Sequence, residues 1–95
     1  VKPEARLSWQ YHHRRKETWR VVNGPVGIAR SLTNEQGPVK IFETGNKVVM
    51  EKGERHRLIG LENWGVVAEF WQHTNLNHPS DEEDIIRVQD DYKRA

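Results

Sequence analysis

Closely spaced turn signals are the feature that most limits what this chain can form. The dipeptides Asn23-Gly24, Gly24-Pro25, Gly37-Pro38 and Gly45-Asn46 interrupt the sequence at short intervals. Between them lie short runs rich in β-branched and aromatic residues. Before residue 80, no window long enough for a typical helix has a helical period. Many short strands separated by turns predict an all-β sandwich or barrel.

Seven segments are predicted to be strands, and a core can be assigned to them. The strands are 7–12, 18–22, 26–29, 39–42, 47–50, 57–59 and 66–71. The predicted core residues are Trp19, Val21, Ala68 and Phe70. Residues 80–92 fit two interpretations: a helix with Ser80 as its N-cap, or a final edge strand around residues 85–88. With 95 residues, the chain has the length of one domain, residues 1–95.

Composition excludes several classes of function. Fifteen Lys and Arg against fourteen Asp and Glu give a net charge of +1, which argues against a nucleic-acid partner. The absence of Cys excludes disulfides, thiolate metal sites and a Cys nucleophile. No apolar run approaches the ~18 residues of a membrane span, and residues 1–8 lack the apolar core of a signal peptide. We therefore expect a cytoplasmic chain without a membrane partner.

Four side chains have the chemistry of a metal site. Gln10 and His12 are two residues apart in a predicted strand, so they face the same side. Glu17 lies just beyond the turn expected at residues 13–16, and His56 follows a later turn. A barrel can bring all four inward. Two imidazole nitrogens, a carboxylate and an amide oxygen suit a divalent ion such as Zn or Mn.

The same residues lie in two segments that resemble the motifs of a known family. Residues 10–19, closed by Asn23-Gly24, resemble the first cupin motif, with six residues between Glu17 and Gly24. Residues 45–56 resemble the second, with Glu51 at the usual proline position. Matches at residues 6–13, 17–24, 56–58 and 84–87 are similar to type II phosphomannose isomerase. The resemblance implies a cupin double-stranded β-helix, or jelly-roll barrel.

This resemblance also implies a reaction and a cofactor. The reaction is aldose–ketose isomerisation of a phosphosugar, mannose 6-phosphate to fructose 6-phosphate. The cofactor is one divalent metal ion, with Zn preferred and Mn, Ni, Co or Fe as alternatives, and its implied ligands are Gln10, His12, Glu17 and His56. In this family the cupin is often the C-terminal module of a bifunctional mannose-1-phosphate guanylyltransferase.

The basic residues of the first motif provide candidates for substrate binding. Arg14, Arg15 and Lys16 are expected at the barrel mouth, where Arg15 would hold the phosphate, with Arg14 beside it and Arg57 as second choice. Lys16 and Arg57 are the candidate catalytic residues. The proton-transferring base is not identified by the sequence, and Lys16, Glu69 and Glu17 are candidates for it.

Three departures from the family keep other functions open. Arg14 and Thr18 stand where the family usually has His, and the upstream strand with an Arg-Pro-Trp-Gly motif is not found in this sequence. The alternatives are a non-catalytic cupin that binds or senses a sugar, and a different metal-dependent cupin enzyme. Because an unpaired edge strand invites pairing with another chain, we expect a homodimer.

The remaining His and aromatic residues receive weaker assignments. His13 alternates away from the proposed ligands and is predicted to lie at the surface. Trp9, Tyr11 and Trp71 fit a core, a dimer surface or a sugar-stacking face equally well.

Overall fold

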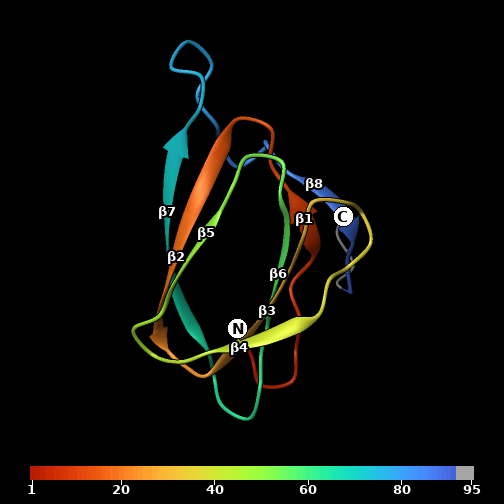
Figure 1. Cartoon of the computed structure of the whole chain (residues 1–95), viewed down its shortest axis with the longest axis vertical. Coiled ribbons are helices and arrows are strands. Elements are labelled where there is room, and N and C mark those ends of the chain that lie inside the picture. The colour runs from red at the N-terminus through yellow and green to blue at the C-terminus, as the bar shows by residue number, and fades with distance from the viewer. Residues whose placement is uncertain (92–95) are drawn as a thin grey trace.

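A computed structural model describes residues 1–91 as two antiparallel β-sheets that face each other (Figure 1). The eight strands are β1 (Trp9–Tyr11), β2 (Arg15–Asn23), β3 (Val26–Ser31), β4 (Val39–Phe42), β5 (Lys47–Met50), β6 (Arg55–Ile59), β7 (Val66–His73) and β8 (Ile86–Gln89). One sheet has the order β4-β3-β6-β1-β8, and the other has the order β5-β2-β7. We call them the five-stranded and the three-stranded sheet.

The alternation of side chains along the strands separates an interior from two outer faces. In β2 the residues at 15, 17, 19 and 21 are buried, whereas those between them are more exposed. The buried apolar residues pack between the sheets as one cluster: Trp19, Val21, Val26, Ile28, Val48, Met50 and Leu58. One part of the space between the sheets is therefore apolar. The buried polar residues of β2, Arg15 and Glu17, precede Trp19 and Val21 of this cluster in the strand.

Glycines shape the turns on either side of β5. Gly45 and Gly53 have φ angles of 92° and 79°, a conformation that residues with a side chain rarely adopt. They lie in the connections from β4 to β5 and from β5 to β6. The glycines of the second motif are thus explained by backbone geometry, since the turn at Gly53 leads directly into the strand that contains His56.

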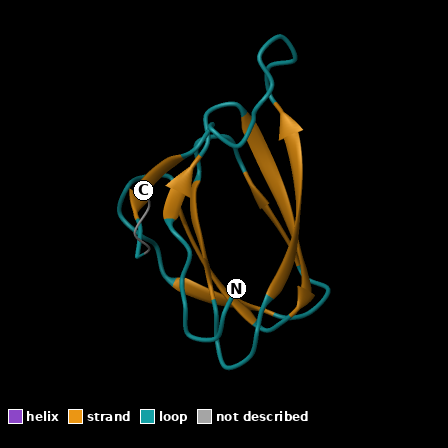
Figure 2. Ribbon diagram, turned by 180° about the vertical axis from the view of Figure 1, so that it is seen from behind, coloured by secondary structure: helices purple, strands orange, loops and turns teal. Residues whose placement is uncertain are grey.

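The predictions of strands from the sequence are confirmed throughout, and the all-β class with them. All seven predicted segments contain a strand. Strands joined by loops make up the described chain (Figure 2). For residues 80–92 the strand alternative is correct: the region contains β8, and no helix occurs within residues 1–91. The last residue of that segment, Tyr92, lies outside the described residues.

Two predicted core residues lie outside the core. Ala68 is only half-buried and lies on the same outer face as Phe70. Phe70 is 60% exposed, because it alternates with Glu69 and Trp71 and faces the outside of the three-stranded sheet. In the part of the chain that the structure describes, no helix is long and apolar enough to cross a bilayer.

Candidate metal centre and pocket

Three elements bring the predicted ligands together between the sheets. β6 of the five-stranded sheet supplies His56, and β2 of the three-stranded sheet supplies Glu17. His12 directly follows β1, at the start of the connection to β2. One nitrogen or oxygen atom from each of the three side chains lies within 4.8 Å of the other two. These side chains are almost fully buried, with His12 3% exposed and Glu17 and His56 1% exposed.

Hydrogen bonding fixes which nitrogen of His12 faces the cluster. The Nδ1 atom lies 2.6 Å from the backbone carbonyl oxygen of Asp84. Because a carbonyl only accepts, Nδ1 carries the proton and Nε2 carries the lone pair. Nε2 lies 3.6 Å from a carboxylate oxygen of Glu17. Burial lowers the pKa of His12 despite the carbonyl of Asp84, so the neutral ring is favoured, which is the form that binds a metal ion.

Glu17 and His56 form the other half of the cluster. His56 Nε2 lies 2.9 Å from Glu17 Oε2. Nevertheless, Glu17 Oε2 and both ring nitrogens of His56 have no hydrogen-bond partner. Burial alone would raise the pKa of Glu17, but His56, together with Glu69 and His12, outweighs burial, and the net effect is a lowered pKa. Glu17 is therefore an ionised carboxylate.

The donor set fits a divalent cation. Buried polar atoms without a partner are rare in proteins, and three of those in the described residues belong to Glu17 and His56, which face each other. Two imidazoles and a carboxylate are the protein ligands of many zinc sites, which leave a further position for water or substrate. His12, Glu17 and His56 could therefore hold a metal ion.

Gln10 lies beside this cluster. Its backbone pairs directly with that of His56 between β1 and β6, and the two side chains line the same pocket. The hydroxyl of Ser8 donates a hydrogen bond of 2.6 Å to Gln10 Oε1. An amide oxygen has two lone pairs, so this bond leaves one for another partner.

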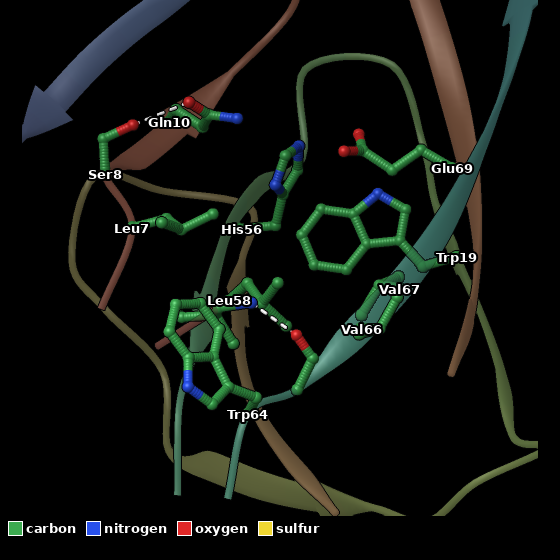
Figure 3. A pocket seen from close by; sticks show the side chains of 12 residues that line it. Leu7, Ser8, Gln10, Trp19, His56, Leu58, Trp64, Val66, Val67 and Glu69 are labelled. Carbon is green, nitrogen blue, oxygen red and sulfur yellow. Dashed lines mark hydrogen bonds between the residues drawn. The ribbon is translucent and has the colours of Figure 1, made fainter. Parts of the chain in front are cut away.

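A pocket of about 360 Å³ opens next to His56 (Figure 3). The Trp19 indole and the His56 imidazole lie edge to face, with centroids 5.0 Å apart. Below them Leu58 and Trp64 give the pocket an apolar wall, whereas Gln10 and Glu69 present polar groups on either side of His56 (Figure 3). Pockets of this size, apolar with a few polar groups, are typical of small-molecule sites.

Glu69 is a second carboxylate near the cluster. It lies on β7 directly opposite Trp19 and lines the pocket. Desolvation in the pocket and the neighbouring Glu17 raise the pKa of Glu69 to about 7. Of the three candidate bases, Glu69 is the one that faces the pocket without being a predicted ligand.

Comparison with known proteins decides the family. The family model described as mannose-6-phosphate isomerase C-terminal matches residues 1–90. The chain belongs to this family. It is 34% identical over all 95 residues to the mannose-1-phosphate guanylyltransferase ManC of Salmonella typhimurium, and 32% identical to the xanthan biosynthesis protein XanB of Xanthomonas campestris. The chain spans 18% and 19% of the lengths of these relatives.

Solved structures show the same fold. The capsular polysaccharide assembling protein CapF of Staphylococcus aureus matches 94% of this chain with a TM-score of 0.67 and 21% identity, and the match covers 26% of CapF. A protein of Photorhabdus luminescens, plu4264, matches 88% of this chain and 59% of its own with a TM-score of 0.64 and 16% identity. CapF has a cupin fold, so the predicted cupin architecture is confirmed.

Within this cupin, Arg15 does not have the exposed position that the sequence predicted. Its guanidinium is 6% exposed and stacks on the ring of Trp71, 3.6 Å from the ring centroid. Nε donates to Glu17 Oε1 over 3.2 Å, and Nη2 lies 3.2 Å from His12 Nε2. With these bonds formed, Arg15 is not free to hold a phosphate, and it binds the metal-centre residues instead.

The other predicted substrate and catalytic residues lie away from the pocket. Arg57 is fully buried on the outer side of the five-stranded sheet, because it follows His56 in β6 and so faces the opposite way. There it donates hydrogen bonds to Gln36 and Gln89. Lys16 likewise alternates with Arg15 and Glu17 and faces outward. Neither residue lines the pocket, so these positions do not support the catalytic role predicted for Lys16 or the two roles predicted for Arg57.

Arg14 also lies away from the position expected for a phosphate-binding residue. Its Nη2 lies 3.4 Å from Asp81 Oδ1, and the residue does not line the pocket. In the part of the chain that the structure describes, neither Lys nor Arg is among the pocket-lining residues.

Sequence reasoning missed Ser8, Trp64 and the segment that contacts His12. Ser8 and Trp64 line the pocket, and the carbonyl of Asp84 binds His12 across 72 positions of sequence. Alternation along the first predicted strand could have indicated that Ser8 faces the pocket, since it lies two residues before Gln10. Neither Trp64 nor the carbonyl of Asp84 has a comparable signal.

Proposed function

We propose that this cupin is a metal-dependent aldose–ketose isomerase of a phosphosugar, similar to mannose-6-phosphate isomerase. The observation that carries the proposal is the position of His56, which belongs both to the ligand cluster and to the wall of the pocket. A sugar in the pocket would therefore contact the ion directly. Membership of the mannose-6-phosphate isomerase C-terminal family supports the choice of substrate.

The residues present suit the requirements of this reaction. Isomerisation moves the C2 proton of the aldose to C1 and the proton of the C2 hydroxyl to the C1 oxygen, without net oxidation. A divalent ion held by His12, Glu17 and His56, with Gln10 as the proposed fourth ligand, would polarise both oxygens. Glu69 faces the pocket from the side opposite Gln10, so we assign it the proton transfer between the two carbons.

The pocket also supports a second candidate, a cupin that binds a sugar without converting it. No Lys or Arg within residues 1–91 lines the pocket, so these residues place no basic side chain beside a phosphate there. The apolar face of Trp64 and the amide of Gln10 are groups that bind an uncharged sugar ring. In either case the cytoplasmic location expected from the sequence is part of the proposal.

One set of measurements separates the two candidates. The zinc-loaded protein is incubated with mannose 6-phosphate, and fructose 6-phosphate is measured over time. In parallel, mannose 6-phosphate and mannose are titrated calorimetrically in buffer free of phosphate and sulfate. The isomerase proposal expects product formation and tighter binding of the phosphorylated sugar. Binding of both sugars with equal affinity and without product would support the non-catalytic alternative. Failure to bind either sugar would contradict both.

A further inference from the structure

We propose that the turn formed by residues 80–84 is a positioning element of the metal centre. It supplies no ligand of its own, but it holds His12 and Glu17 in the orientation in which they would bind the ion. The inference rests on the proposed metal site and adds to it a segment far away in sequence. In Figure 1 this segment belongs to the connection between β7 and β8, which passes the end of the barrel where β2 begins.

The first contact of the turn sets the orientation of an imidazole. The carbonyl oxygen of Asp84 accepts the Nδ1 proton of His12 over 2.6 Å. This bond fixes both the tautomer and the rotation of the ring, so that Nε2 points at Glu17. Outer partners of this kind are found around most metal-binding His residues.

The carboxylate of Asp84 holds the backbone that follows His12. It accepts hydrogen bonds from the backbone N–H groups of His13 and Arg14, each over 2.9 Å, and from the hydroxyl of Ser80 over 2.6 Å. Asp84 is 4% exposed and Ser80 is 7% exposed, so water cannot replace these bonds easily. The backbone that directly follows the ligand His12 is therefore attached to the turn.

The second contact of the turn reaches Glu17 through Arg15. Arg15 Nη1 donates to Ser80 Oγ and to the carbonyl oxygen of Asp81, each over 3.1 Å. The Nε atom of the same guanidinium donates to Glu17 Oε1 over 3.2 Å. The planar group thus transmits the position of the turn to the carboxylate, which leaves Glu17 Oε2 directed at His56.

The experiment compares three variants of the full chain. Asp84→Ala removes the acceptor of three hydrogen bonds, and Ser80→Ala is a milder change that removes one bond to Asp84 and one from Arg15. Glu83→Ala is the matched control, because Glu83 is an exposed acidic residue of the same turn. Two properties are measured for each folded variant: the dissociation constant for zinc, by competition with a chelator, and the NMR resonance of the His12 Nδ1 proton in the metal-free protein.

Asp84→Ala keeps the backbone carbonyl that binds His12 but removes the side-chain bonds that hold this carbonyl in place. We expect it to weaken zinc binding by about 10- to 100-fold, the range for disturbing an outer-shell partner. Ser80→Ala should have a smaller effect in the same direction, and Glu83→Ala none. The His12 Nδ1 resonance should be slow to exchange in the wild type and the control, and lost or fast-exchanging in Asp84→Ala. If Asp84→Ala does not fold, Ser80→Ala alone decides by the same two measurements.

The two proposals fail in different ways. A wild-type protein that does not bind zinc would contradict the metal site, and the His12 resonance would then test the turn by itself. Zinc binding in the wild type with an unchanged constant and an unchanged resonance in the turn variants would overturn the positioning role.

Discussion

His56 is the residue on which the metal centre and the pocket both depend. Its ring nitrogens have no hydrogen-bond partner, although the residue is only 1% exposed. We predict that His56→Ala abolishes the binding of a divalent ion. An ion that binds only the folded protein stabilises it, by ~2.7 kcal/mol when its concentration is 100 times the dissociation constant, so the variant should lose the rise in melting temperature caused by zinc. Metal analysis and thermal unfolding with and without zinc measure both effects.

The control for this prediction is His78→Ala, because His78 lies in the exposed connection after β7. It should retain the wild-type metal content and the zinc-dependent rise in melting temperature. Equal metal content in His56→Ala and the wild type would show that the ion binds elsewhere.

Glu69 allows a second prediction at the same scale. If it transfers the proton, Glu69→Gln should lower kcat for isomerisation by about 10²- to 10⁴-fold, the range found for general acid–base groups. The zinc content should not change, since Glu69 is outside the ligand cluster. Steady-state kinetics and metal analysis of Glu69→Gln are compared with those of Glu62→Gln, which changes an exposed residue in the preceding loop. A kcat equal to the wild type would exclude the assignment.

At the scale of the element, adjacent residues of strand β6 face opposite sides of the sheet and have different roles. His56 faces the space between the sheets, and its neighbour Arg57 faces outward, where it donates to Gln36 Oε1 and to the side-chain and backbone oxygens of Gln89. Arg57 is fully buried, so its loss removes these hydrogen bonds and leaves the space of its side chain empty. The predicted substrate role of Arg57 is therefore replaced by a structural one.

This replacement leads to the third prediction. Arg57→Ala should lower the free energy of unfolding by about 1.5–3 kcal/mol, the value of hydrogen bonds made by a charged group. Zinc affinity and sugar affinity of the folded variant should stay at wild-type values. Urea unfolding and calorimetric titration measure the two effects. The reverse result, an unchanged stability with weakened sugar binding, would restore the original interpretation.

The elements themselves could be predicted because their signals are local. Gly45 and Gly53 mark turns, and the alternation along β2 separates Glu17 and Trp19 from the residues between them. The approach of His12, Glu17 and His56 followed from motif spacing. The same alternation also excludes Lys16 from the face of Glu17, so this error could have been avoided from the sequence.

Contacts between distant segments could not be predicted in this way. The bond from His12 to Asp84 ends on a backbone carbonyl, which every residue has, so no residue type indicates it. The burial of Arg15 depends on Ser80 and Trp71, which lie in two other parts of the chain. From the sequence alone, Arg15 is one of three adjacent cations and resembles an exposed hairpin tip.

At the scale of the whole molecule, the two sheets are unequal. The three-stranded sheet ends at β7, which pairs only with β2 in the described residues, so its other edge has unpaired backbone groups. The outer face of the same sheet has exposed apolar side chains: Phe70 is 60% exposed, Val22 53% and Val49 42%. Natural proteins usually cover or charge such edges. Here both features lie on the same sheet, which supports the homodimer expected from the sequence.

The last prediction concerns this assembly. We expect sedimentation equilibrium at micromolar concentration to give about twice the monomer mass of 11.2 kDa. Phe70→Lys places a charge on the outer face beside the free edge, and burying an unpaired charge between two copies is unfavourable, so this variant should be monomeric. Leu76→Lys is the matched control, because Leu76 is 88% exposed in the connection after β7, and it should stay dimeric. A monomeric wild type across the concentration range would exclude the dimer, and a dimeric Phe70→Lys would move the interface away from this sheet.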